Sequence, residues 1–312
     1  MALPIYASPL ERIWHYSYLV ICTAIFIFLV APILVVLPLS FNVEPYFTFT
    51  EKMLTLDPAG YSMRWYDMLL TDGMLAPEVP RVGAWWSDMW QNATWVKAAK
   101  NSLIIGFWST ILATVLGTLA ALGLSRPEMP YRRVIMAILI SPMIVPIIII
   151  ATGLFFFYSS PCGLVGLDCG RLTATYAGVI MAHATLGIPF VIITVTATLT
   201  GFDQSLIRAS ASLGANPRTT FFKVIMPLIL PGVVSGALFA FVTSFDEVVA
   251  VLFIAGPEQQ TIPRQMWNGI REAISPAILA VATILVIFSI LLLATVEILR
   301  RRSEKLRGVT PA

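Results

Sequence analysis

Charge is scarce in this chain, and several sequence patterns typical of enzymes are absent. Only 12% of its 312 residues are charged, about half of the fraction expected in a soluble domain. It contains no Gly-Lys dipeptide and so no G-x-x-x-x-G-K-[ST] loop with which to hold ATP phosphates. Neither H-E-x-x-H nor G-x-S-x-G occurs, which argues against hydrolase chemistry. We therefore expect a chain that is not an enzyme and binds no cofactor itself.

Apolar residues dominate the composition instead. Hydrophobic residues make up 58% of the chain, and the mean hydropathy is +0.84. An apolar excess this large needs lipid as its solvent. The net charge of +3 is too small to indicate a nucleic-acid partner. The sequence therefore predicts an all-α integral membrane protein in a lipid bilayer.

Six runs are long and apolar enough to cross a bilayer, which takes about 20 residues of helix. We expect spans at residues 18–41, 103–124, 135–157, 174–199, 228–255 and 277–299. The first run is too long for a cleavable signal. Each span should be helical, because every backbone polar group in hydrocarbon needs a partner within its own segment. Prolines within or beside these runs predict kinks in several spans: Pro32, Pro142, Pro146, Pro189 and Pro231.

The positions of Lys and Arg predict how the chain is oriented. Basic residues collect at 1–17, at 201–227 and at 300–312, whereas the 42–100 segment carries more acids than bases. Because basic loops stay in the cytoplasm, both termini and the 201–227 loop should be cytoplasmic, and 42–100 should be external. The expected organisation is a lead-in at 1–17, one six-span domain at 18–299 and a basic tail at 300–312.

Cysteine usage agrees with this orientation. Cys162 and Cys169 lie in a short loop that would face an oxidising compartment. A disulfide between them is one interpretation, and two free thiols in a Gly-rich turn is the other. No cluster of His, Asp or Glu accompanies them, so we expect no metal site. Cys22 lies in the first span, where a thiol behaves as a small apolar group.

The external 42–100 segment is rich in tryptophan, including Trp65, Trp85, Trp86, Trp90 and Trp95. Indole rings favour the headgroup level of a membrane, where an apolar body and a polar tip are both satisfied. The alternative is that some of these rings line a funnel that receives a cationic ligand.

The polar loop at 201–227 is unusually long and rich in small residues. Residues 207–214 have a composition typical of a helix, and Asn216-Pro217 is a stop signal. Small side chains there would let the backbone of a partner approach closely. The loop is therefore either a rigid docking element or an ordinary amphipathic connector.

This loop resembles the EAA loop of bacterial ABC importer permeases. That pattern is Glu-Ala-Ala, three residues, Gly, nine residues and Ile-x-Leu-Pro. Here it reads Arg208-Ala209-Ser210, three residues, Gly214, nine residues and Val224-Ile225-Met226-Pro227, so Arg208 replaces the usual Glu. The resemblance implies a coupling loop that docks on a separate ATPase, formed by Arg208, Ala209, Ser210, Leu213, Gly214, Ala215 and Pro227.

Other short motifs follow the order seen in the C-type permease of the spermidine/putrescine importers, from about residue 17 to residue 300. They are GYSMRWYDMLL at 60–70, Asn101-Ser102-Leu103, Ser141-Pro142, Gly187-Ile188-Pro189-Phe190, Ser244-Phe245-Asp246-Glu247, Gly256-Pro257 and Ile262-Pro263. The resemblance implies a type I ABC importer permease in the bacterial inner membrane.

The same resemblance implies three partners: a second related permease subunit, a cytoplasmic ATPase dimer that binds ATP and Mg²⁺, and a periplasmic solute-binding protein. The implied function is to form the translocation pathway for a small organic solute, with a polyamine such as putrescine or spermidine as the first interpretation. The alternatives are another small solute such as an amino-acid derivative or, from another class, a passive channel or membrane scaffold.

Two acids fall inside the fifth expected span. An ionised carboxylate at the centre of a span costs at least about 2.5–3.5 kcal/mol, so it normally faces protein or water. On a continuous helix, Asp246 follows Phe239 and Thr243 along one face, and Glu247 lies nearer to Ser244. We interpret these five residues as lining the substrate pathway, with Asp246 foremost. The alternative is a salt bridge or hydrogen bonds to another helix or subunit.

Overall fold

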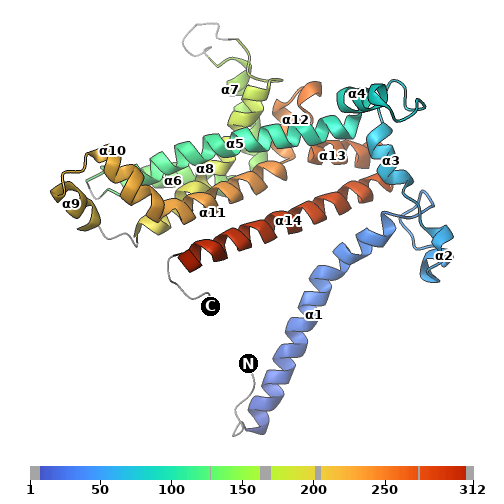
Figure 1. The fold of residues 1–312 in the computed structure, drawn as a ribbon, viewed down its shortest axis with the longest axis horizontal. Helices are drawn as coiled ribbons and strands as arrows, with labels where there is room; N and C mark the ends of the chain where they lie inside the picture. Colours follow the sequence, from blue (N-terminus) through green and yellow to red (C-terminus); the bar gives the residue numbers. More distant parts are fainter. Residues whose placement is uncertain (1–7, 127, 162–169, 201–204, 273–274, 307–312) are drawn as a thin grey trace. The chain divides into compact units, whose positions relative to one another are not determined.

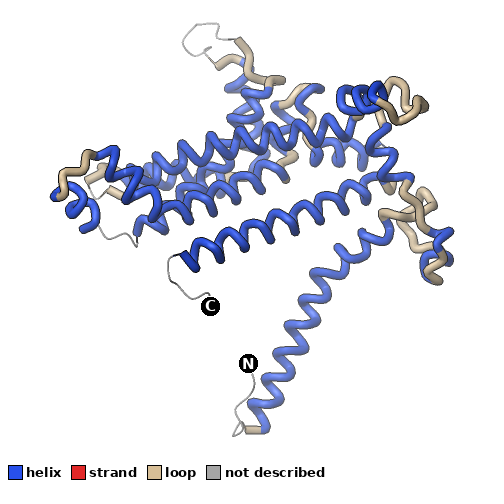
Figure 2. The backbone as a smooth tube through the Cα atoms, viewed as in Figure 1, coloured by secondary structure: helices blue, strands red, loops and turns tan. Residues whose placement is uncertain are grey.

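The structure is a computed structural model that describes residues 8–126, 128–161, 170–200, 205–272 and 275–306. Throughout those ranges the chain is helical, apart from loops and an isolated bridge between Asn42 and Tyr61 (Figures 1 and 2). The long helices are α1 (Pro9–Leu39), α5 (Thr94–Leu124), α6 (Arg132–Ile144), α7 (Ile147–Ser159), α8 (Tyr176–Thr200), α11 (Met226–Phe245), α13 (Ile262–Glu272) and α14 (Ala277–Leu306). The short ones are α2 (Glu51–Leu54), α3 (Arg64–Thr71), α4 (Gly83–Asn92), α9 (Ser205–Ser212), α10 (Pro217–Thr220) and α12 (Val249–Ile254). Two 3₁₀ turns lie at Pro58–Gly60 and Pro257–Gln259, and a π-helical segment at Phe221–Ile225.

The helices account for the six predicted spans. Five of them in the described residues are long and apolar enough to cross a membrane: α1, α5, α8, the helix that runs from Pro217 to Phe245, and the part of α14 up to Thr295. α6 and α7 pass the same test as a pair. The prediction of an all-α protein with six spans is confirmed when this pair is counted as one span.

The third expected span is not one straight helix, as the prediction of proline kinks anticipated. α6 ends at Ile144, α7 begins at Ile147, and the two are bent by 105°. Val145 between them has an extended backbone, with φ −72° and ψ 135°. A residue before proline is driven out of the helical region by the proline ring, so Pro146 explains the break.

The chain divides into two compact units, and the first consists of Met1–Thr71 and Gly269–Ala294. In this unit α1 begins with a capping box, in which Ser8 and Glu11 satisfy each other's backbone N–H groups. The connection that follows α1 is held by the Trp65 indole, which donates to the carbonyl of Asn42 (2.7 Å). The most apolar stretch of α1 has no buried residue within the chain, as expected of a helix that faces lipid or another subunit.

The second unit, Asp72–Asn268 with Thr295–Ala312, carries the motifs of interest. Its core is α8 packed against both α5 and α11, which also pack against each other. Val191 of α8 lies where these helices meet, and a Cβ added at Gly117 of α5 or Gly236 of α11 would lie within 2.8 Å of its atoms. Small residues at these positions let the three helices approach closely, as in other membrane helix bundles.

Candidate functional site

The polar loop after α8 folds around a short helix that ends at a glycine. α9 (Ser205–Ser212) is followed by Gly214 with φ +77°, a left-handed conformation that favours glycine. The N–H of Gly214 donates to the carbonyl of Ala211 (2.9 Å), and the N–H of Ala215 to the carbonyl of Ser210 (3.1 Å). These two bonds form the Schellman arrangement that closes a helix C-terminus. The helix predicted in this loop is confirmed.

A second short helix turns the chain back toward the bundle. α10 (Pro217–Thr220) is capped by Asn216, whose side-chain oxygen accepts the N–H of Thr219 (2.8 Å). The hydroxyls of Ser210 and Thr220 hydrogen bond to each other, and both residues are buried. This bond joins α9 to α10 directly. We refer to α9, the turn after it and α10 together as the elbow.

The outer surface of the elbow presents an apolar side chain that is left exposed by the part of the chain that the structure describes. Leu213 is 88% exposed, more than any other large apolar side chain in the described residues. Ile207, Arg208 and Ala209 are also exposed, and Ala215 is half-buried. The predicted docking residues other than the buried Ser210 are thus accessible to a partner.

The elbow is continuous with a membrane span. α10 passes without a break into the π-helical segment Phe221–Ile225 and then into α11, and the whole path from Pro217 to Phe245 is one helix of 29 residues. Pro227 lies directly after the π-helical segment, and a proline inside a helix removes one backbone hydrogen bond, which the local change in helix geometry accommodates. Because helices are stiff, a displacement of the elbow would be transmitted along α11 to its far end.

At that far end the helix stops, so the expectation of one continuous span at 228–255 is wrong. α11 ends at Phe245, and α12 starts afresh at Val249. The carboxylate of Glu247 accepts the N–H of Ala250 in the first turn of α12 (2.8 Å). This bond satisfies one of the backbone N–H groups that have no partner inside a helix at its N-terminus, which favours a new helix there. We refer to residues 246–248 as the helix break (Figure 1).

The helix break separates the two acids. Glu247 is buried, with 8% of its surface exposed, whereas Asp246 is exposed. Of the other predicted pathway residues, Phe239 is 54% exposed and stacks on Phe190 of α8, and Thr243 is half-buried. Phe239 and Asp246 are thus accessible to a ligand or a partner, whereas the side chain of Glu247 is occupied by its hydrogen bond to α12.

Ser244 belongs to a buried polar cluster rather than to an open surface. Its hydroxyl accepts the hydroxyl of Ser109 on α5 (2.9 Å) and lies 2.7 Å from Nδ1 of His183 on α8. All three residues are buried. A lone histidine in a span is more often held by an interhelical hydrogen bond than used in function, and His183 follows that pattern. The cluster joins the three core helices in the last turn of α11, directly before the helix break.

The loop after α12 is anchored to the same region by two side chains of other helices. Asn101 of α5 donates to the carbonyls of Glu258 (2.8 Å) and Gln260 (2.9 Å). Arg264 donates to the carbonyls of Val251 (3.2 Å) and Ala255 (3.0 Å) at the end of α12. Burial lowers the pKa of this guanidinium below its ordinary value. A cation is nevertheless favoured at a helix C-terminus.

The anchoring role of these residues was not predicted from the sequence. Asn101-Ser102 was noted only as a motif, although a polar pair at the start of an apolar run could have indicated a helix that holds a neighbouring loop. Ser102 does so too, since its hydroxyl accepts the N–H of Ile262 (2.8 Å). Arg264 gave no signal, because an arginine in a loop rich in Gly and Pro is expected to be solvated.

Two of the sequence predictions concern thiols and metals. Cys162 and Cys169, for which a disulfide and two free thiols were the two interpretations, lie outside the described residues. Cys22 is free and exposed on α1. Among the residues that the structure describes, no three His, Cys, Asp or Glu side chains are grouped as a metal would require.

Solved structures share this arrangement of helices. A bacterial ABC transporter that imports the acidic polysaccharide alginate matches 96% of this chain and 99% of its own, with a TM-score of 0.63 and 17% identity. The MetNI methionine ABC transporter matches 69% of this chain with a TM-score of 0.50 and 21% identity. The fold is that of the permease subunits of type I ABC importers.

Sequence comparison defines the family. Residues 113–305 match the family described as "Binding-protein-dependent transport system inner membrane component". The spermidine/putrescine transport system permease protein PotC of Haemophilus influenzae is 28% identical over 280 residues, which cover 90% of this chain and 95% of that protein. The putrescine transport system permease protein PotI of Escherichia coli is 29% identical over 286 residues, covering 91% and 88%.

This chain therefore belongs to the family of inner membrane components of binding-protein-dependent transport systems. It is a multi-pass inner-membrane protein and the permease subunit of an ATP-driven importer. Members of this family are transport subunits rather than enzymes, and ATP is hydrolysed by a separate subunit.

Proposed function

We propose that this chain pairs with a second, related permease subunit to form the pathway by which a polyamine enters the cell. A cytoplasmic ATPase dimer, which binds the ATP and Mg²⁺, docks on the elbow, and a periplasmic solute-binding protein delivers the ligand. The observation that carries the proposal is the unbroken helix from the elbow to the helix break, with an exposed leucine at one end and an exposed aspartate at the other.

The proposed orientation places both termini and the elbow in the cytoplasm. The elbow and the first turn of α6 carry basic residues, Arg208, Arg218, Arg132 and Arg133. Short loops rich in Lys and Arg remain on the cytoplasmic side. The helix break then lies toward the periplasm, where a binding protein would release its ligand.

In this arrangement the elbow couples ATP hydrolysis to transport. Closure of the ATPase dimer displaces its docking surface, and Leu213 would be buried in a pocket of that surface. The Schellman turn and the Ser210–Thr220 bond keep the elbow from deforming. A rigid elbow transmits this displacement to α11, whereas a flexible loop would absorb it.

A polyamine suits the chemistry of the helix break. Putrescine and spermidine are chains of methylene groups with ammonium groups, which need carboxylate or carbonyl oxygens when they leave water. The Asp246 carboxylate is exposed in the helix break, and the ring of Phe239 is exposed on α11 before it. An aromatic face can bind the cation or its methylene chain. The names of the curated relatives support the same substrate class.

Uptake of radiolabelled putrescine tests this function. Deletion of the gene for this chain should reduce ATP-dependent uptake to background, and a plasmid copy should restore it. Excess unlabelled spermidine should compete, whereas an amino acid should not. Uptake that is unchanged by the deletion would refute the polyamine assignment. Uptake that depends on this chain but persists when ATP hydrolysis is blocked would instead support a passive channel.

A further inference from the structure

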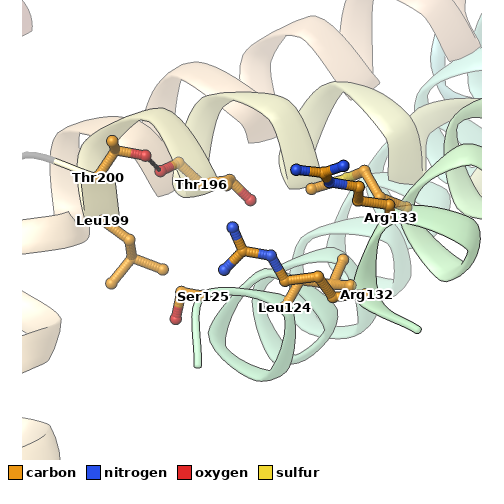
Figure 3. Close-up of a pocket in the computed structure, with 8 residues that line it drawn as sticks. Leu124, Ser125, Arg132, Arg133, Thr196, Leu199 and Thr200 are labelled. Carbon is orange, nitrogen blue, oxygen red and sulfur yellow. Dashed lines mark hydrogen bonds between the residues drawn. The ribbon is translucent and has the colours of Figure 1, made fainter. Parts of the chain in front are cut away.

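A cavity of about 480 Å³ opens where α5 and α8 end and α6 begins (Figure 3). It lies within the second unit, at the same end of the core helices as the elbow. Its walls include Arg132 and Arg133 of α6, Ser125 after α5 and Thr196 of α8. None of these residues belongs to the proposed substrate pathway or the elbow.

The two arginines give the cavity a positive charge that no carboxylate among the described residues compensates. Adjacent residues on a helix point about 100° apart, yet both Arg132 and Arg133 line this one cavity. Within the described part of the chain, no carboxylate lies within salt-bridge distance of either guanidinium, and the first turn of α6 contains no acid. Two like charges that share a cavity repel each other, so an anion between them would be stabilising.

The start of α6 adds to this charge. Its N-cap, Tyr131, has a left-handed backbone and makes no side-chain capping bond. The first N–H groups of a helix have no partner inside the helix, and the macrodipole places partial positive charge there. Cations are disfavoured at this position, yet the helix begins with two of them. An anion bound here would satisfy the helix terminus and both guanidinium groups together.

A buried hydroxyl without a partner supplies an observation that is independent of charge. Oγ1 of Thr196 is shielded from solvent and has no hydrogen-bond partner in the described residues. Figure 3 shows this hydroxyl turned toward the arginine side chains. A buried polar group without a partner costs free energy that a bound acceptor would recover.

The remaining walls favour an amphiphile over a free ion. Leu124, Met136 and Leu199 give the cavity an apolar part of its lining, and the cavity lies at the ends of apolar spans. We propose that this cavity binds the phosphate headgroup of an anionic glycerophospholipid, with the acyl chains against these apolar residues and the spans. The bound phosphate joins α6 to the ends of α5 and α8, and so fixes one half of the bent third span.

Lipid titration of the purified full-length chain tests the proposal. Binding is measured by native mass spectrometry and by the apparent Tm, with dioleoylphosphatidylglycerol, dioleoylphosphatidylcholine and inorganic phosphate as separate ligands. R132Q/R133Q should weaken phosphatidylglycerol binding about tenfold or more, because it removes the charge-assisted hydrogen bonds from the two guanidinium groups to the phosphate. R12Q/R126Q is the matched control: it removes the same charge from residues outside the cavity and should bind as the wild type does.

Thr196→Val keeps the charge and the side-chain shape, so it tests the site even if the double variant is unstable. It should weaken phosphatidylglycerol binding about fivefold, through the loss of one hydrogen bond. Equal binding by R132Q/R133Q and R12Q/R126Q would overturn the site. Equal affinity for phosphatidylcholine would overturn the preference for an anionic lipid. A Tm rise with inorganic phosphate alone, as large as that with lipid and lost in R132Q/R133Q, would identify free phosphate as the ligand.

Discussion

The two ends of α11 differ in how they use their polar and apolar groups. At the elbow the polar groups are satisfied locally, by the Gly214 turn and the Ser210–Thr220 bond, while Leu213 remains exposed. At the helix break the polar side chains of Ser244, His183 and Asn101 form hydrogen bonds from one helix to another helix or loop. The apolar residues of α12 are largely buried. One end is therefore shaped for contact with another protein, and the other is held by contacts within the chain.

This difference predicts different responses to substitution. A change at the elbow should alter association and coupling with little effect on the stability of the bundle. A change at the helix break should alter either the ligand or the fold, according to whether the side chain is exposed or buried. One helix connects the two ends, so each type of change can be compared on the same transport assay.

The largest effect is expected at Gly214. Valine cannot adopt φ +77° without strain of about 1–3 kcal/mol, so Gly214→Val should open the turn and abolish both ATPase co-purification and uptake. A Cβ at this position would meet no atom within 4 Å, so the effect is conformational rather than steric. Gly214→Asn is the matched control, because asparagine tolerates the left-handed region and should retain most activity. Equal loss in both variants would contradict a role for the turn.

Asp246 should give the next largest effect. Asp246→Asn keeps the size of an exposed side chain and removes its charge. A hydrogen bond to a charged group contributes about 1.5–3 kcal/mol, so putrescine uptake should fall about tenfold or more while ATPase co-purification persists. Glu258→Gln removes an exposed acid from the loop after α12 and should leave uptake near the wild-type rate. Wild-type uptake by Asp246→Asn would remove this residue from the pathway.

Substitution of Ser244 should lower the stability of the bundle, because this residue is buried in a polar cluster and is not exposed to a ligand. Ser244→Ala leaves His183 and Ser109 with one partner fewer in a buried interface, at a cost of about 1–3 kcal/mol. The apparent Tm of the purified chain should drop, and a double-mutant cycle with Ser109→Ala should show coupling between the two sites. Thr185→Val, which removes a hydroxyl that bonds only within α8, is the control. Strictly additive effects would argue that the two hydroxyls act independently.

The sequence predicted the elbow better than it predicted the helix break, for a physical reason. The elbow is formed by local signals: a small-residue helix, a glycine that closes it, and Asn216-Pro217, which was interpreted as a stop signal and which the structure places at the start of α10. Each acts over only a few residues. Six spans were likewise predicted, because hydropathy over about 20 residues decides membrane insertion.

The helix break depends on tertiary contacts that no local pattern specifies. The run at 228–255 is apolar enough to continue as one helix, and periodicity alone placed Asp246 and Glu247 on it. What ends α11 is the start of α12, where Glu247 caps the new helix and Arg264 binds its other end. Ser244 was expected in the pathway, but its buried partners lie 61 and 135 residues away in the chain. Such pairings follow from packing, which one sequence does not reveal.

The smallest expected effect is a difference in how the two ends of the second unit respond to acid. Asp88 in α4, near the helix-break end of the second unit (Figure 1), accepts hydrogen bonds from Asn92 and from the N–H groups of Ala76 and Leu75. These bonds hold its pKa below the ordinary value. Their contribution is therefore present above about pH 3.9 and is lost as the pH falls through the lower folded-state pKa. The elbow, by contrast, is held by hydroxyl, amide and backbone groups that do not titrate in this range.

Hydrogen exchange, corrected for the intrinsic rate at each pH, can measure this contrast. On acidification from about pH 6 to about pH 3, the amides of Leu75 and Ala76 should lose protection, while those of Gly214 and Ala215 should retain it. Asp88→Asn is the control, because it should lose part of that protection already at neutral pH and respond less to acid. If the elbow amides lost protection first, the elbow would be the less rigid end, and its proposed role in transmitting displacement to α11 would not hold.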